Sequence, residues 1–547
     1  MLKKAMKYLR WLYAHSKGAR GAIVANIVLG STSVGLNLYF IFLCKRLVDV
    51  ATGVFDGNIY WYTALAIIVT ALRLAVQAVN QRIENLTTSK MSFIIRKDLY
   101  SNLLQAEWLG KEKRHSGDVI NRMETDVNSV TSVICEDVPR SVTTVIQLIA
   151  AVIFLCTMDW RLALVILLIS PAFIAFGRIF VKKMRRMTRG IRDTESQVQS
   201  HLQESLQHRM LIQSMETVPM MEDKLDDLQN TEYGQVMERT RFNVFARTMI
   251  GSSFAFGYIA AFLWGAYGIW RGSITYGVMT AFLQIVGQIQ RPIVELTREL
   301  PAIVNATASI DRLMELEDTP KEESGEPIKL SVPTGVRIDN VSYRYPDGDH
   351  DILRNFSFDF PPLSRTAVVG ETGSGKSTMI RLILALLKPS EGSVTLYDGK
   401  QAEAASPRTR CNLVYVPQGN TLLSGTIRDN LRMGDPDADE QQMFEALRTA
   451  AAEFVSDLPD GLDTLCGEGG AGLSEGQAQR IAIARGLLRP GSILLLDEFS
   501  SSLDPETERR LMDSLIERAS GKTIIFITHR ERIAEFCDRQ CRIERLP

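Results

Sequence analysis

The decisive stretch of the chain, residues 366–378, reads TAVVGETGSGKST. A short apolar strand runs into a glycine-rich loop, and residues 379–387 are typical of the helix that follows. In this strand–loop–helix context the GxxxxGK[ST] pattern predicts a phosphate-binding loop, whose glycines let backbone N–H groups close around phosphate oxygens. The candidate residues are Gly370, Glu371, Thr372, Gly373, Ser374, Gly375, Lys376, Ser377 and Thr378.

A second segment, SILLLDE at residues 492–498, delivers two acids at the end of an apolar strand. Taken alone, the acids could simply end a strand or cap a helix. Beside a phosphate loop they predict a Mg²⁺-dependent nucleotide hydrolase. We expect Asp497 and Ser377 to hold Mg²⁺ and Lys376 to reach the β- and γ-phosphates. Glu498 is then placed to polarise the attacking water.

The part of the chain before residue 300 is of a different kind, because all of its long uncharged stretches lie there. A membrane-crossing helix needs about 20 mostly apolar residues. The sequence predicts six spans, at about residues 21–45, 57–80, 138–158, 161–181, 247–270 and 273–300. The expected fold is an all-α six-helix transmembrane domain with long cytoplasmic helical extensions, followed by an α/β P-loop NTPase domain.

The distribution of Lys and Arg orients these spans. The segment before the first span and the inner loops 82–133 and 182–241 are rich in both, whereas the opposite loops contribute only Arg161 and Arg271. The positive-inside rule therefore predicts that both termini are cytoplasmic. Both inner loops are suited to helices that continue past the bilayer, and residues 2–14 predict an interfacial amphipathic helix.

A change of composition at residues 315–334, rich in Glu, Lys, Pro and Ser, predicts a linker between a domain at 1–314 and another at 335–547. The 547 residues carry a net charge of −1. This balance argues against nucleic-acid binding through overall charge. The mean hydropathy of +0.00 is an average over two unlike halves. Seven scattered Cys without a CxxC pair predict reduced, packed thiols.

Further short motifs follow one another in the back half: YRYP at 343–346, VPQ at 416–418, LSEGQ at 473–477, SSLD at 501–504 and ITH at 527–529. Singly each is weak, and His529 or Tyr345 alone would more often be an ordinary packed or surface residue. Together with the phosphate loop they resemble the ATP-binding cassette (ABC) family. The six spans before one cassette are similar to an exporter half-transporter.

The resemblance implies a role for each matched residue. Tyr345 would stack on adenine, Gln418 would contact Mg²⁺ and the attacking water, and His529 would act with Glu498 in catalysis. ATP would lie between the phosphate loop of one cassette and the LSEGQ segment of another. The residues that would act across this interface are Ser474, Gly476, Gln477 and Asp504. The implied partner is a second copy of the chain or a related half-transporter.

In the front half, SGDVINRMETDV at 116–127 and ESL at 204–206 are similar to inner-loop segments of ABC exporters. The family places coupling helices at such loop tips, here near residues 104–113 and 206–211. Three departures from the family pattern stand out: LSEGQ in place of LSGGQ, Ala478 in place of Arg or Lys, and Gly469 in place of the Arg of a GERG loop.

The expected function is ATP-driven export, or leaflet-to-leaflet translocation, of a lipid, an amphipathic drug-like molecule or a peptide across the bacterial cytoplasmic membrane. The alternative is a non-pumping membrane ATPase, such as an ATP-gated channel or a regulatory subunit. The substrate contacts stay open. Arg73 could bind an anionic substrate, or it could snorkel or pair with another residue at the inner end of the spans. Gln284, Gln288 and Gln290 could line a pathway or join helices through hydrogen bonds.

Overall fold

The computed structural model describes residues 2–108, 116–346, 348, 350–467, 472–519 and 521–545; side chains at 165–182 and at a few other positions lie outside this description. The described residues form two compact units. The helical unit contains residues 2–101 and 116–318, and the mixed α/β unit contains residues 102–108 and 319–545. The short segment 102–108 therefore folds with the second unit, although its first three residues are the last three of a long helix of the first unit.

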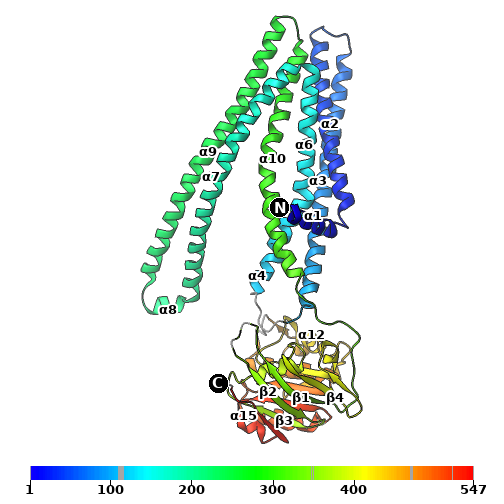
Figure 1. Cartoon of the computed structure of the whole chain (residues 1–547), viewed down its shortest axis with the longest axis vertical. Coiled ribbons are helices and arrows are strands. Elements are labelled where there is room, and N and C mark those ends of the chain that lie inside the picture. The colour runs from blue at the N-terminus through cyan, green and yellow to red at the C-terminus, as the bar shows by residue number, and fades with distance from the viewer. Residues whose placement is uncertain are drawn as a thin grey trace. The chain divides into compact units, whose positions relative to one another are not determined.

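The helical unit consists of long helices joined by short turns (Figure 1). Its helices are α1 Leu2–His15, α2 Arg20–Ala51, α3 Ile59–Leu104, α4 Ser116–Asn121, α5 Val127–Ser132, α6 Val138–Met158, α7 Trp160–Gln207, α8 Arg209–Ser214, α9 Val218–Trp270 and α10 Tyr276–Glu317. Two π-helical turns, Arg122–Asp126 and Val133–Asp137, join α4, α5 and α6. Figure 1 shows α7 and α9 side by side, with α8 closing their far end.

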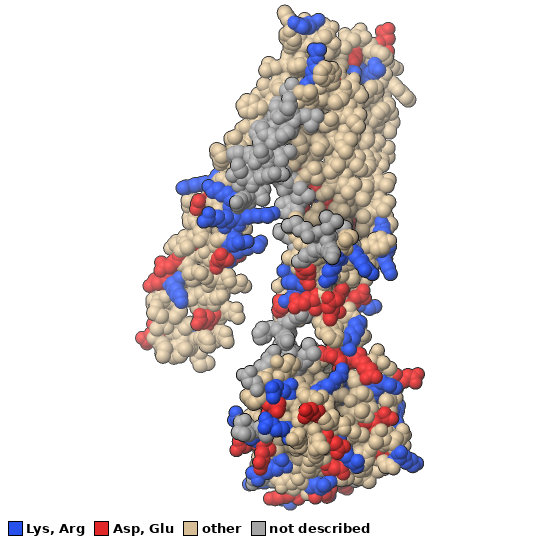
Figure 2. All heavy atoms as spheres, viewed as in Figure 1, with Lys and Arg blue, Asp and Glu red and all other residues tan. Residues whose placement is uncertain are grey.

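Four helical segments in the described residues are long and apolar enough to cross a membrane: Arg20–Ala51, Ile59–Leu104, Gly117–Met158 and Val218–Trp270. Their outward faces carry large apolar side chains such as Ile67, Ile68 and Ile153, which are 65%, 60% and 58% exposed. Figure 2 shows a long surface over these helices with almost no charged residue. An apolar surface of this extent needs a lipid environment. The predicted span 161–181 falls within α7, and the predicted span 273–300 overlaps α10 from Tyr276 on; both stay predictions.

Several helices are much longer than a bilayer requires. The 53 residues of α9 span about 80 Å at 1.5 Å per residue, against about 30 Å for the hydrocarbon core. The prediction that the inner loops continue as helices is thus confirmed for α3, α7 and α9.

The helix predicted at residues 2–14 is present as α1 and is attached to the end of α10, while its position at the membrane interface stays a prediction. The Trp11 indole N–H donates to Glu317 at 2.7 Å, and the His15 ring lies 2.9 Å from the other Glu317 oxygen. Burial alone would raise the pKa of Glu317, but the hydrogen bonds from His15 and Trp11 hold it below its usual value. The pKa of His15 is raised in return, chiefly by its bond to Glu317.

The polar residues of the predicted spans make contacts between helices. Arg73 on α3 donates to the Asn37 side chain on α2, and the Gln147 amide on α6 donates to Gln288 on α10 at 2.8 Å. These contacts fit the helix-joining alternative for Gln288. Arg73 has a polar, uncharged partner, so its positive charge is not neutralised by that contact.

The mixed α/β unit contains a parallel five-stranded sheet of order β11-β3-β10-β9-β6, an antiparallel sheet of order β2-β1-β4-β5, and the short pair β7-β8. The strands are β1 Gly335–Tyr343, β2 Leu353–Phe360, β3 Arg365–Val369, β4 Glu391–Tyr397, β5 Ala402–Ala404, β6 Leu413–Val416, β7 Gly425–Thr426, β8 Leu465–Cys466, β9 Ile493–Asp497, β10 Thr523–Thr528 and β11 Arg539–Arg542. Its helices are α11 Lys376–Ile383, α12 Ile427–Arg432, α13 Glu440–Thr449, α14 Glu475–Leu488, α15 Pro505–Arg518 and α16 Glu531–Ala534.

The register of the parallel sheet brings distant parts of the chain to one edge. Thr528 at the end of β10 pairs with Val369 at the end of β3, and Ile527 pairs with Asp497 at the end of β9. Because the carboxyl ends of parallel strands share an edge, the segments that follow these strands meet there.

Two boundaries differ from expectation. The helix expected at residues 379–387 begins earlier, at Lys376, and ends at Ile383. It ends because Ala385 takes a left-handed φ of 51°, and the backbone N–H groups of Leu386 and Leu387 turn back to the Arg381 carbonyl. At the other boundary, α10 continues to Glu317, inside the segment 315–334 that was expected to be a linker.

Candidate nucleotide-binding site

The phosphate loop lies between β3 and α11, as the motif predicts. Gly373 and Gly375 adopt φ values of 85° and 103°, a region that side chains disfavour. The Lys376 amine donates to the carbonyls of Gly370 and Glu371 at 2.7 and 2.8 Å. The hydroxyl of Ser374 is buried and has no hydrogen-bond partner in the described structure. A buried donor without a partner, inside a loop of this shape, fits an anionic ligand such as a phosphate group.

A pocket of about 1100 Å³ opens over this loop. It brings Gln418, Glu498 and His529 together with the loop, although they follow different strands. The predicted site residues that line the pocket are Gly370, Glu371, Thr372, Gly373, Gly375, Lys376, Ser377, Thr378, Gln418, Glu498 and His529. The predicted phosphate-loop and catalytic residues therefore share one cavity, apart from Ser374, which is buried and is not part of the lining.

Glu498 is held in this pocket from both sides. The Gln418 amide donates to its Oε2 at 2.7 Å, and the His529 Nδ1 lies 3.6 Å from its Oε1. The backbone at Glu498 is left-handed, with φ of 41°, and its N–H donates to the Ile527 carbonyl. Non-glycine residues rarely adopt this conformation, and it is typical of functional positions.

The neighbouring Asp497 has a different environment, because it is only 6% exposed and the Tyr415 hydroxyl donates to it at 3.3 Å. Burial raises the pKa of Asp497, and the nearby Glu498 charge adds to the shift. A buried carboxylate with one hydrogen-bond donor gains from a cation. Together with Ser377 at the start of α11, Asp497 offers the oxygen ligands that Mg²⁺ prefers.

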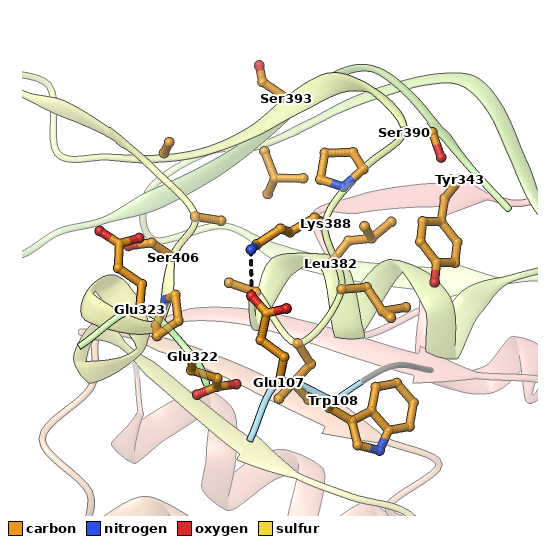
Figure 3. Close-up of a pocket in the computed structure, with 18 of the residues that line it drawn as sticks. Glu107, Trp108, Glu322, Glu323, Tyr343, Leu382, Lys388, Ser390, Ser393 and Ser406 are labelled. Atoms are coloured by element: carbon orange, nitrogen blue, oxygen red, sulfur yellow. Dashed lines mark hydrogen bonds and ion pairs between the residues drawn. The ribbon is translucent and has the colours of Figure 1, made fainter. Parts of the chain in front are cut away.

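Tyr345, the predicted adenine-stacking residue, does not line this pocket within the described structure. Its hydroxyl pairs with Thr378 at 3.2 Å and accepts from Arg381 at 2.9 Å. The Arg381 guanidinium lies 4.7 Å from the ring centre of Trp108. Trp108 and Glu107 line a second pocket of about 540 Å³, in which Glu107 points towards Lys388 (Figure 3). The segment 105–108 is thus linked through Arg381 to the end of the phosphate-loop motif.

The residues expected to act across an interface lie elsewhere. Ser474 caps α14 in a reciprocal pair with Gln477, and Asp504 caps α15. Ser474, Gly476, Gln477 and Asp504 are absent from the pocket lining in the described part of the chain. Ala478, one of the three departures, is fully buried, so a small residue suits its position. Gly469 and residues 109–113 of the first expected coupling helix lie outside the described residues.

Sequence reasoning missed three residues beside this site. Tyr415 is bonded to Asp497, and Arg381 is bonded to Tyr345. Gln479 donates to the Glu498 carbonyl at 3.2 Å and accepts from the Ser502 hydroxyl at 2.8 Å. Each lies within three residues of a motif residue, so attention to the flanks of the motifs could have found them.

Comparisons with known proteins agree with this geometry. The family model for the ABC transporter transmembrane region matches residues 22–293, and the ABC transporter model matches residues 353–501. An ATP-dependent lipid A-core flippase of Pseudomonas fluorescens is 31% identical over 456 residues, which cover 81% of this chain and 74% of that protein. A putative multidrug export ATP-binding/permease protein of Bacillus subtilis is 26% identical over 534 residues, which cover 96% of this chain and 92% of that protein.

Among solved structures, a bacterial Atm1-family ABC exporter with ATP bound matches with a TM-score of 0.78 and 24% identity, covering 96% of this chain and 93% of that one. This likeness shows that the fold is shared. The half-transporter layout, the phosphate loop with its two acids and the family matches all agree. The chain therefore belongs to the ABC transporter family, as an exporter-type half-transporter whose ATPase domain hydrolyses ATP to drive transport.

Proposed function

We propose that two copies of this chain, or this chain and a related half-transporter, export a lipid, an amphipathic drug-like molecule or a peptide across the bacterial cytoplasmic membrane. Movement from one leaflet to the other is the same process for a lipid. One observation carries the proposal: Glu498 lies in the phosphate pocket, 2.7 Å from Gln418 and 3.6 Å from His529. The names of the multidrug export and flippase relatives favour amphipathic substrates.

In the proposed reaction, Glu498 polarises a water molecule for attack on the γ-phosphate of ATP. Gln418 fixes one carboxylate oxygen, which leaves the other oriented towards His529 and the water. Lys376 leaves its carbonyl partners to meet the β- and γ-phosphates. Ser377, Asp497 and Gln418 would hold Mg²⁺, which when bound neutralises developing negative charge on the phosphate oxygens.

The second cassette is required because one chain offers only part of the site. Ser474, Gly476, Gln477 and Asp504 are exposed or half-buried and line no part of the described nucleotide pocket. We infer that they meet ATP held by the partner, while Tyr345 stacks on adenine in its own chain. ATP would then favour the closed dimer because only that state binds it from both sides.

The tip of the α7–α9 hairpin supports the transmission of this closure to the membrane. Residues of the expected second coupling helix and of α8 expose apolar side chains, with Leu206 73%, Met210 84% and Leu211 53% exposed. Apolar side chains at a hairpin tip rich in polar residues indicate a docking contact. We infer that this tip rests on an ATPase domain, so that closure alternates the spans between inward- and outward-facing arrangements. The Lys and Arg of the inner loops would keep both termini and the ATPase domains in the cytoplasm.

The test is reconstitution in liposomes with Glu498→Gln as the inactive variant. ATP hydrolysis should fall by about 100-fold or more, as expected for loss of a general base, while ATP binding persists. Glu517→Gln on the exposed face of α15 is the matched control and should leave turnover unchanged. A screen of lipids, drugs and peptides then reads ATPase stimulation and uptake.

Two results would contradict the proposal. Transport that continues in Glu498→Gln would remove this residue from the mechanism. A wild-type protein that hydrolyses ATP but moves no substrate under any nucleotide condition would favour the non-pumping ATPase.

A further inference from the structure

The C-terminal strand β11 lies at the edge of the parallel sheet and ends beside the phosphate loop. Arg542 pairs with Val369, and the Ile543 N–H donates to the Val369 carbonyl at 2.9 Å. A Cβ atom added at Gly370 would lie 2.4 Å from the Ile543 carbonyl oxygen. The chain at residues 543–545 therefore runs directly alongside the first residue of the phosphate loop.

Successive side chains along β11 point to opposite sides, and this alternation turns Arg542 towards the pocket. Cys541 and Ile543 are buried, at 2% and 3% exposure, and pack into the core. Arg542, between them, faces the other way and is exposed. Both Arg542 and the following Arg545 line the pocket that holds residues 370–378. Within the described residues neither arginine has a hydrogen bond or an ion pair.

The pocket lining contains three basic side chains, Lys376, Arg542 and Arg545. It also contains the carboxylates of Glu371, Glu498 and Glu544, so these charges balance before an anion binds. Lys376 is bonded to two backbone carbonyls, and Glu498 is engaged by Gln418. The two arginines are thus the cations in this lining that have no partner in the described structure. A guanidinium presents several N–H donors in a planar fork that matches phosphate oxygens.

We propose that Arg542 and Arg545 bind the phosphate chain of the nucleotide, as cationic contacts additional to Lys376. The proposal rests on the ATP-binding function proposed above and adds residues that none of the motifs contains. It predicts that the contribution of the two arginines depends on the number of phosphates, because their charge acts on the phosphates and not on the base.

The experiment uses the full chain in detergent and measures the Kd of ATP, ADP and AMP in the presence of Mg²⁺. Arg542→Gln with Arg545→Gln should weaken ATP binding about tenfold, as expected for the loss of partly exposed charge-assisted hydrogen bonds. ADP should be affected less, and AMP by no more than about twofold. Replacement of both by Lys, which keeps the charge but not the planar fork, should restore part of the affinity. Arg518→Gln, at the end of α15 and outside the pocket lining, is the matched control.

The outcomes separate this proposal from the one it rests on. Equal losses for ATP, ADP and AMP would indicate a distorted pocket and overturn the phosphate contact, as would a Kd no different from that of Arg518→Gln. If the double Gln variant does not fold, each single Gln variant should still raise the Kd of ATP about threefold. Failure of the wild-type protein to bind ATP would instead refute the ATP-binding function itself.

Discussion

The segment Gln105–Trp108 pairs through its backbone with residues 320–322, and the ion pair of Glu322 with Arg410 holds those residues in place, so removing that pair should loosen the segment. Glu322 follows an isolated bridge between Ala106 and Lys321, and its N–H donates to the Gln105 carbonyl at 2.9 Å. Its carboxylate accepts two bonds of 2.8 Å from the guanidinium of Arg410. The predicted effect of Glu322→Ala is therefore a local opening of this pairing.

The magnitude follows from the burial of the two partners. Arg410 and Glu322 are 27% and 23% exposed, so the pair is partly shielded from water. Charge-assisted hydrogen bonds contribute about 1.5–3 kcal/mol each when well shielded, and partial exposure reduces that to about 2 kcal/mol for the pair. Arg410 keeps its bonds to the Leu384 and Ala385 carbonyls, so it is not left without partners. About 2 kcal/mol corresponds to an opening equilibrium about 30-fold larger.

Hydrogen exchange measures this opening directly. The backbone N–H of Glu107 donates to the Pro320 carbonyl at 2.8 Å, so its protection should fall about 30-fold in Glu322→Ala. Glu323→Ala is the matched control, because the neighbouring residue is exposed and makes no ion pair in the described structure. Lys388→Ala removes the pair with Glu107 in Figure 3, but Lys388 is 80% exposed, so the change should stay below about fivefold. Equal exchange in Glu322→Ala and Glu323→Ala would refute the reasoning.

Two further predictions concern other contacts. Gly476→Ala should lower ATP turnover about tenfold or more without abolishing ATP binding. The added Cβ would lie 2.8 Å from the Ser502 carbonyl oxygen, so the start of α14 or the segment that contains Ser502 must move. Steady-state ATPase assays and nucleotide titration check this. The attachment of α1 should weaken as pH rises. Glu317, with a smaller contribution from Asp98, holds the pKa of His15 above 6.5. The stabilisation that protonated His15 gives to the folded state is therefore lost as the pH passes that raised value. Hydrogen exchange of α1 at about pH 6 and 8.5, corrected for intrinsic rates, measures it, and a pH effect that persists in His15→Gln would count against it.

The nucleotide pocket could be anticipated because its parts are local motifs at the ends of parallel strands. The phosphate loop is a single stretch, and Glu498 and His529 each directly follow a strand of the same sheet. Once those strands are expected to lie parallel, their carboxyl ends must meet. The long helices past the membrane were also accessible, because the inner loops contain few glycines and Pro219 is the one proline in loops 82–133 and 182–241, a composition that is read directly from the chain.

Side-chain partners that depend on non-local pairing were not accessible. Nothing in the local sequence indicates that Trp108, four residues after the end of α3, packs against Arg381, or that Glu322 pairs with Arg410. The position of Arg542 also needed the register of β11 on β3. Such contacts are set by which strands and loops become neighbours, and that is a property of the whole fold.

The two adjacent acids show how one strand end can separate two roles. β9 ends at Asp497, whose side chain is buried in the protein, and the next residue, Glu498, has a left-handed backbone with φ of 41° and lines the pocket. Burial raises the pKa of Asp497, which makes it costly to keep ionised unless a cation is present. Glu498 is instead oriented by Gln418 beside the phosphate loop, where a base must lie. The environments therefore assign the metal to one acid and the water to the other, a division that a degenerate, non-hydrolysing site would have no reason to keep.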